Sequence, residues 1–136
     1  MKDIKVKDIM TRGAITIFQE ATVIQAIQIL SDNDISGIVV ISQKGEIVGI
    51  ISDTDIIKVL NEDVNNILVK DVMTTPVITI NKDALISEAW KQMKSQNIHR
   101  LVVFQEVSTK EETPKKHFAS GIVSISDIIR AIKNNS

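Results

Sequence analysis

The stretch VKDIMT, residues 6–11, returns 63 residues later as VKDVMT, residues 69–74. The same offset carries ITI at residues 15–17 onto ITI at residues 78–80. Self-similarity at a fixed period indicates a repeated supersecondary unit. The 136-residue chain is therefore predicted to contain two copies of one unit.

A second motif closes each copy. GIISDTD, residues 49–55, returns as GIVSISD, residues 121–127, where the offset has grown from 63 to 72 residues. The second copy therefore carries nine extra residues before its closing motif. They fall in a polar stretch, which predicts a long hairpin loop at about residues 105–118 on the protein surface.

Both copies show the same order of predicted elements: strand, amphipathic helix, strand, strand, helix. In the first helix of each copy, apolar residues recur at i, i+3, i+4 and i+7, which places them on one face. This pattern predicts Trp90 in the core. Asp83 lies where an N-cap or a first-turn acid would favour the helix dipole. Met10 and Met73 are expected to fill gaps in the core.

The fold class predicted is α/β, built from two β-α-β-β-α repeats, residues 1–62 and 63–136. A unit of about 60 residues is marginally stable alone. The middle strands are continuously apolar, which indicates that both faces of each sheet are covered. Helices cover one face, so the repeats are expected to pack sheet to sheet.

Composition excludes several classes of function. The formal net charge is −1 and no basic patch is visible, so nucleic acid is not an expected partner. There is no cysteine, and the two histidines, His99 and His117, do not form a metal-site pattern. No apolar run reaches the ~18 residues of a membrane span. The first residues lack a signal-peptide core. A cytoplasmic protein without a membrane segment is expected.

These motifs resemble the cystathionine-β-synthase domain (CBS domain) family over nearly the whole chain. The resemblance rests on the paired openings, the paired closings and the segment NIHRLVV at residues 97–103. It implies two repeats related by a pseudo-twofold axis, often called a Bateman module, with ligand clefts between them. It also implies a homodimer formed by stacking of CBS pairs. Members of the family commonly bind AMP, ADP, ATP or S-adenosylmethionine as regulatory ligands, and no cofactor is required.

The resemblance also implies roles for particular residues. The closing aspartates accept hydrogen bonds from ribose hydroxyls, each assisted by the serine three residues earlier. Basic residues before the second strand bind phosphate, and they occur only in the second copy, where the first has Ser36 and Gly37. Adenine lies against the start of each first strand. The implied site residues are Ser52, Asp55, Ser124, Asp127, His99, Arg100, Ala14, Ile15, Val77 and Ile78.

The chemistry of these residue types is consistent with such roles. A carboxylate can accept from both hydroxyls of a vicinal diol, and arginine offers a rigid fork of donors to phosphate oxygens. However, Ser-x-x-Asp before a helix is also a capping-box pattern. Either reading leaves the aspartates as exposed carboxylates at helix starts.

Three functions follow as hypotheses. The first is a non-enzymatic regulatory module that senses an adenosine-containing ligand and acts on a separate, unidentified protein. The second is a dimerisation or interaction scaffold with empty clefts. The third, an enzyme, is disfavoured because the chain has no cysteine nucleophile, no glycine-rich phosphate loop and no repeated His/carboxylate constellation suited to acid–base chemistry. No catalytic residue is assigned.

Overall fold

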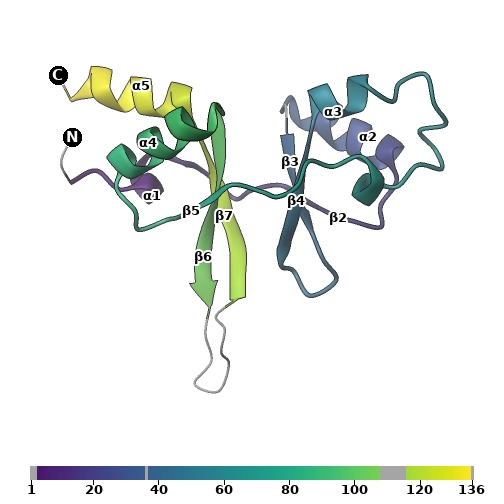
Figure 1. Cartoon of the computed structure of the whole chain (residues 1–136), viewed down its shortest axis with the longest axis horizontal. Helices are drawn as coiled ribbons and strands as arrows, with labels where there is room; N and C mark the ends of the chain where they lie inside the picture. Colours follow the sequence, from purple (N-terminus) through teal and green to yellow (C-terminus); the bar gives the residue numbers. More distant parts are fainter. Residues whose placement is uncertain (1–2, 36, 108–115, 136) are drawn as a thin grey trace. The chain divides into compact units, whose positions relative to one another are not determined.

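The computed structural model describes residues 3–35, 37–107 and 116–135. Their contacts divide the chain into two compact units. The middle unit is Ile15–Val77, and the terminal unit combines Met1–Ala14 with Ile78–Ser136. Each unit contains strands and helices in the predicted β-α-β-β-α order (Figure 1), so the predicted mixed α/β fold class is confirmed.

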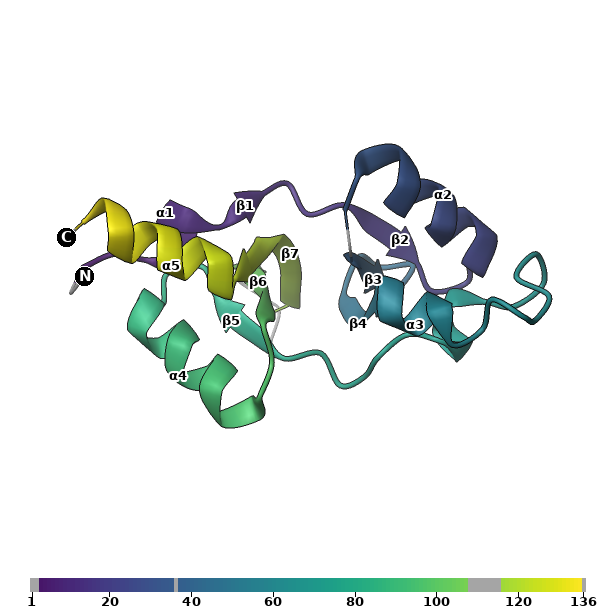
Figure 2. The ribbon, with the colours of Figure 1, turned by 90° about the horizontal axis from the view of Figure 1, so that it is seen from above.

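In the middle unit, three strands form one sheet in the order β2-β3-β4. The first pair is parallel and the second antiparallel. Helices α2 and α3 lie side by side against this sheet (Figure 2). The core between them is aliphatic and includes Ile38, Val40 and Ile51, each 0% exposed. The elements are β2 (Thr16–Phe18), α2 (Val23–Asn33), β3 (Gly37–Ile41), β4 (Ile47–Ser52) and α3 (Asp53–Ile57).

The terminal unit has a four-stranded sheet in the order β1-β7-β6-β5. Its extra strand and a short helix come from the N-terminal segment. Its core includes Val6, Leu101 and Val103, so that segment is part of the core. The elements are α1 (Val6–Ile9), β1 (Thr11–Arg12), β5 (Thr79–Asn81), α4 (Ile86–Gln96), β6 (Arg100–Val107), β7 (Lys116–Ser124) and α5 (Ile125–Asn134).

The opening segment of each repeat is hydrogen-bonded to the strand–helix junction of the other repeat. In the terminal unit, Val6 N–H donates to the Ala84 carbonyl at 2.8 Å. In the middle unit, Val69 N–H donates to the Ala21 carbonyl at 2.7 Å. Residue 69 follows residue 6 by the repeat offset, and residue 84 follows residue 21 by the same offset. The compact units therefore exchange the segments that the repeats 1–62 and 63–136 keep together.

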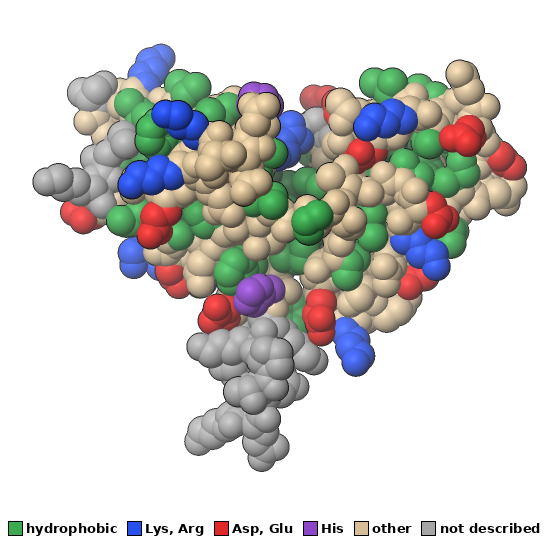
Figure 3. Space-filling model, in the orientation of Figure 1, with side chains coloured by type: hydrophobic (Ala, Val, Ile, Leu, Met, Phe, Trp, Pro, Cys, Tyr) green, Lys and Arg blue, Asp and Glu red, His purple; other side chains and the backbone are tan. Residues whose placement is uncertain are grey.

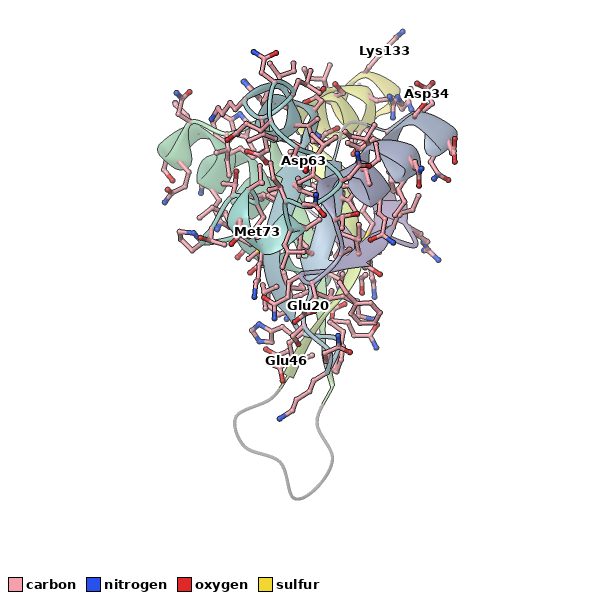
Figure 4. The ribbon with its side chains drawn as sticks, turned by 90° about the vertical axis from the view of Figure 1, so that its right-hand side faces the viewer. Glu20, Asp34, Glu46, Asp63, Met73 and Lys133 are labelled. Atoms are coloured by element: carbon pink, nitrogen blue, oxygen red, sulfur yellow. The ribbon has the colours of Figure 1, made fainter. Side chains whose placement is uncertain are left out.

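The exchanged opening segments pack against the glycines of the closing motifs, Gly49 and Gly121. Thr11 pairs antiparallel with Ile122, and Thr74 forms the equivalent bridge with Ile50. Gly121 therefore lies directly beneath the Thr11 carbonyl. In the middle unit, the thioether of Met73 rests on Gly49. Figure 4 labels Met73. The predicted gap-filling methionine contacts a glycine that has no side chain to fill the space itself.

Helices α2 and α4 end in the same way, and α2 begins with a capping box. Thr22 and Gln25 form a capping box at α2, with Thr22 N–H donating to Gln25 Oε1 at 2.9 Å. Asp34 ends α2 with φ 50°, and Asn97 ends α4 with φ 53°. Aspartate and asparagine tolerate this left-handed conformation better than most residues. Figure 4 shows Asp34 at that end of α2.

Two predictions about side chains are wrong. Leu85, not Asp83, is the N-cap of α4. Asp83 instead forms an ion pair with Lys7 at 3.2 Å, and the hydrogen bond from that lysine lowers the pKa of the Asp83 carboxyl. Trp90 is not in the core, because 44% of it is exposed, and Lys94 Nζ lies 5.3 Å from the centre of its ring.

The predicted hairpin loop is shorter than expected. Residues 105–107 continue β6 and residues 116–118 belong to β7, so both ends of the predicted loop are strand. Phe104 and His117 stack across these strands with ring centres 4.0 Å apart. The remainder, residues 108–115, lies outside the described residues.

The glycine contacts generate a stability prediction. An ideal Cβ at Gly121 would overlap the backbone carbonyl of Thr11, whereas one at Gly49 would first meet the flexible Met73 side chain. Gly121→Ala should therefore lower the free energy of unfolding by about 1–3 kcal/mol, the usual range for overpacking. Gly49→Ala, the matched control, should lower the free energy of unfolding less, because the Met73 side chain can change rotamer. Urea unfolding measures both, and an equal or larger loss at Gly49 would contradict the assignment.

Candidate functional site

The first candidate cluster lies in the middle unit, where β4 ends and α3 begins. The Asp55 carboxylate closes the first turn of α3, because its Oδ2 accepts from Ser52 N–H at 2.9 Å and from Ser52 Oγ at 3.1 Å. Its Oδ1 accepts from Thr74 Oγ1 at 2.9 Å. Three donors therefore converge on one carboxylate, and the third comes from the opening motif of the second repeat.

The equivalent cluster in the terminal unit has a different set of partners. Asp127 Oδ2 accepts from Ser124 N–H at 2.8 Å, and Ser124 Oγ accepts in return from Asp127 N–H at 3.2 Å. Asp127 Oδ1 faces Arg130 Nη1 at 3.3 Å. Arg130 comes from the same helix, one turn later. This cluster is a complete capping box with one exposed cation beside it.

The expectation that both aspartates are exposed is wrong. Asp55 is 7% exposed, and the Asp127 side chain is 12% exposed. A nearly buried carboxylate is tolerated only when donors satisfy it, and the donors named above do so. Both aspartates are therefore part of the fold as well as candidates for ligand contact.

The basic residues lie next to the second cluster. Arg100 begins β6 and stands directly opposite Ser124 in the antiparallel pair with β7. The His99 carbonyl accepts from Ile125 N–H at 2.9 Å, which ties this residue to the first turn of α5, and the residue itself is exposed. In the middle unit, buried Gly37 stands opposite Ser52. Ser36, the other predicted counterpart, lies outside the described residues.

The predicted adenine residues lie where the chain passes from one compact unit to the other. Ala14 ends one segment and Ile15 begins the next, and the same boundary falls between Val77 and Ile78. The Ile15 carbonyl accepts from Val39 N–H at 3.2 Å. The Ile78 carbonyl accepts from Val102 N–H at 3.3 Å. The main chain at both positions is thus held against an inner strand of its sheet, β3 or β6.

Sequence reasoning missed Thr74 and Arg130 as partners of the candidate carboxylates. Arg130 lies three residues after Asp127, the spacing at which helix side chains meet, so the sequence contained a signal for it. Thr74 belongs to the repeated opening motif, but nothing local indicates that its hydroxyl reaches Asp55. That contact arises only from the exchange of opening segments.

The described residues contain neither the pattern of a metal site nor that of a membrane-spanning helix. No group of three or more metal-ligating side chains occurs among residues 3–35, 37–107 and 116–135. Within those same ranges, no helix is long and apolar enough to cross a membrane. Acidic and basic side chains are interspersed over the face shown in Figure 3. At the turn end of the middle unit, Figure 4 shows Glu20 and Glu46, and Gln43 donates to Glu20 at 3.3 Å.

Comparison with known proteins identifies the repeat. The CBS domain family model matches residues 6–62 and 69–134. Protein MJ1426 of Methanocaldococcus jannaschii is 31% identical, and the match covers 93% of this chain and 90% of that protein. The inosine-5′-monophosphate dehydrogenase of the same organism is 27% identical over 95% of this chain, which spans only 24% of the enzyme. The chain likewise spans 63% of MK0525 of Methanopyrus kandleri and 32% of MJ1404 of M. jannaschii.

Solved structures agree with the family match. The crystal structure of the CBS domain pair of protein MJ0100, in complex with 5′-methylthioadenosine and S-adenosyl-L-methionine, superposes with a TM-score of 0.80. It is 27% identical, and the match covers 97% of this chain and 98% of that one. CBSX2, solved in complex with AMP, has a TM-score of 0.76 at 20% identity, with 97% of this chain and 98% of that one covered, and supports the fold alone.

The two clusters should contribute unequally to stability. Asp55→Ala removes the acceptor of three hydrogen bonds and should lower the free energy of unfolding by about 2–3 kcal/mol. Asp127→Ala removes a helix cap and an exposed arginine contact, and should cost about 1–2 kcal/mol. Urea unfolding of the two variants checks this order. If Asp127→Ala is the more damaging change, the Thr74 contact contributes nothing.

Proposed function

Because the chain belongs to the CBS domain family, we propose that it is a regulatory module that binds an adenosine-containing ligand and modulates a separate partner protein. The observation that carries this proposal is the CBS domain pair of MJ0100, which has been solved with two adenosine derivatives. These two ligands share adenine and a ribose. The shared ribose diol is the feature that the two closing aspartates suit chemically.

Asp127 and Asp55 are the proposed ribose acceptors, assisted by Ser124 and Ser52. An ionised carboxylate accepts two hydroxyl donors at once, and such charge-assisted bonds are among the stronger ones. The capping geometry does not compete with this role, because each carboxylate uses Oδ2 for the helix and presents Oδ1 to other partners. Ala14, Ile15, Val77 and Ile78 are the proposed adenine contacts.

Arg100 and His99 are the proposed contacts for an anionic group on the ligand. They adjoin Ser124 in the same unit, and Arg100 provides planar donors that match a phosphate or carboxylate. The counterpart of Arg100 in the first repeat, Gly37, has no side chain, and Ser36, the counterpart of His99, is uncharged. We therefore expect AMP, ADP, ATP and S-adenosylmethionine to be distinguished mainly at the terminal unit.

A scaffold without ligand is the second candidate function. It is favoured by the capping boxes, which satisfy all four Ser and Asp side chains without any bound molecule. An enzymatic function is not proposed, since the chain spans only a small part of the enzymes that it resembles.

A cytoplasmic location also stays a prediction.

We further propose that two copies of the chain associate through exposed apolar side chains. Ile129 and Ile132 on α5 are 61% and 41% exposed. Ile57 and Leu60, the same positions of the first repeat, are 66% and 55% exposed. The repetition of this exposure, 72 residues apart, suits a self-complementary interface, in which one surface meets its own copy.

The ligand proposal is tested by a thermal shift with S-adenosylmethionine, 5′-methylthioadenosine, AMP and ATP. A ligand that binds only the folded protein at 100 times its Kd stabilises it by about 2.7 kcal/mol. For a domain of this size the melting temperature should rise by about 10 °C. The 2′-deoxy analogue should produce a much smaller shift, because it leaves an acceptor of the carboxylate unpaired. If none of these ligands shifts the transition, the scaffold function is the correct one.

The association proposal is tested by sedimentation velocity. Wild-type protein should sediment as a dimer, and Ile129→Glu combined with Ile132→Glu should sediment as a monomer, because charges are costly in an apolar interface. Asn134→Glu, on the same helix but outside the apolar pair, serves as the control and should remain dimeric. A monomeric wild type, or a dimeric double variant, would exclude this interface.

A further inference from the structure

We propose that Thr74 is a latch on Asp55: its hydroxyl holds the carboxylate in the unliganded protein, so that an adenosine ligand engages Asp127 first. The ligand then reaches Asp55 only by displacing Thr74. This inference rests on the proposed ligand function and adds an order of binding to it.

The two carboxylates differ in the number of hydrogen-bond acceptor positions that remain open. A carboxylate offers about four lone-pair positions, two on each oxygen. At Asp55, Ser52 N–H and Ser52 Oγ take both positions of Oδ2, and Thr74 takes one of Oδ1. A ribose diol needs two acceptor positions, and only one is left.

Asp127 is less fully engaged. Ser124 N–H takes one position of Oδ2, while Ser124 Oγ turns to accept from the Asp127 main chain instead. The remaining contact is with Arg130 at 3.3 Å, and the Arg130 side chain is 67% exposed. An ion pair with an exposed arginine contributes little to stability, because the guanidinium can exchange the carboxylate for water. Asp127 can therefore receive a diol by displacing, at most, the exposed Arg130 side chain.

Thr74 is also held more firmly than Arg130. Its N–H donates to the Ile50 carbonyl at 2.8 Å, and its carbonyl accepts from Ile50 N–H at 3.2 Å. The preceding residue, Met73, rests on Gly49. These main-chain contacts keep the Thr74 hydroxyl within reach of Asp55, whereas Arg130 is held at the carboxylate only by its own flexible side chain.

The other unit offers a natural control within the same chain. Thr11 occupies the position equivalent to Thr74 and pairs with Ile122 as Thr74 pairs with Ile50. Among the hydrogen bonds of the described residues, however, none joins Thr11 to Asp127. Lys58 stands where the second repeat has Arg130, and the described contacts include none between Lys58 and Asp55. The repeats thus use different partners for the same carboxylate.

The latch connects ligand occupancy to the chain segment between the units. Thr74 lies in the stretch from Val69 to Val77, which leads out of the middle unit into β5. A ligand at Asp55 would break the Thr74–Asp55 hydrogen bond, which is one of the contacts that hold this stretch to the middle unit. A ligand at Asp127 would displace only a surface arginine. The second binding event is therefore the one suited to a signal.

The experiment isolates the Asp55 site and removes the latch. Isothermal titration with 5′-methylthioadenosine is done on Asp127→Asn, and on the same variant with Thr74→Val added. Loss of one competing hydrogen bond should raise the affinity of the Asp55 site about three- to tenfold. Thr74→Ser, which keeps the hydroxyl, should bind like its parent, and Thr11→Val should have no effect. The gain should disappear with 2′-deoxy-5′-methylthioadenosine.

The outcomes separate the latch from the ligand function itself. If wild type binds the nucleoside and Thr74→Val leaves the affinity unchanged, or lowers it, the latch is refuted and the ligand function stands. If no protein in the series binds, both are refuted. Should Asp127→Asn fail to fold, the methyl NMR signal of Thr74 in wild type provides the same test. It should shift with the second equivalent of ligand, and a shift with the first equivalent would overturn the proposed order.

Discussion

The structure depends on the exchange of opening segments between the two repeats. Each unit lacks one short segment of its own repeat and receives the equivalent segment of the other, anchored by Val6 N–H on Ala84 and Val69 N–H on Ala21. Both valines are 0% exposed, so the exchange buries apolar side chains and satisfies main-chain groups together. Neither repeat completes its core alone. This is a physical reason why the two copies occur in one chain.

The same exchange shapes the candidate site. The segment that covers Gly49 with Met73 also brings the Thr74 hydroxyl onto Asp55. A side chain at Gly49 would first meet the Met73 thioether, so the absence of a side chain gives the methionine its place. The closing motif of the first repeat, residues 49–55, resembles a ligand-binding motif, and it is also where the opening segment of the second repeat packs. Under the proposed function, one contact serves both folding and the response to ligand.

Much of the fold could be predicted because periodicity reports local structure. Strand and helix order followed from apolar spacing, and the two copies confirmed each other. Trp90 was misplaced because an i, i+3, i+4, i+7 pattern identifies a face but not the width of the buried stripe on that face. Asp83 was misplaced because residue type suggested a cap, while Lys7, its actual partner, is distant in sequence and adjoins it only in the folded unit.

Residue spacing and identity are enough to establish that the chain has two β-α-β-β-α repeats, which residues close each repeat, and that the basic pair belongs to the second copy only. These features depend only on residue spacing and identity, which are the same in the unfolded chain. The folded chain is needed to show which opening segment joins which unit, and that Asp55 is bound by Thr74 whereas Asp127 faces Arg130. The two repeats have a threonine at the same position, so no local pattern distinguishes them. The difference arises from hydrogen-bond geometry, which exists only after the exchanged segments are in place.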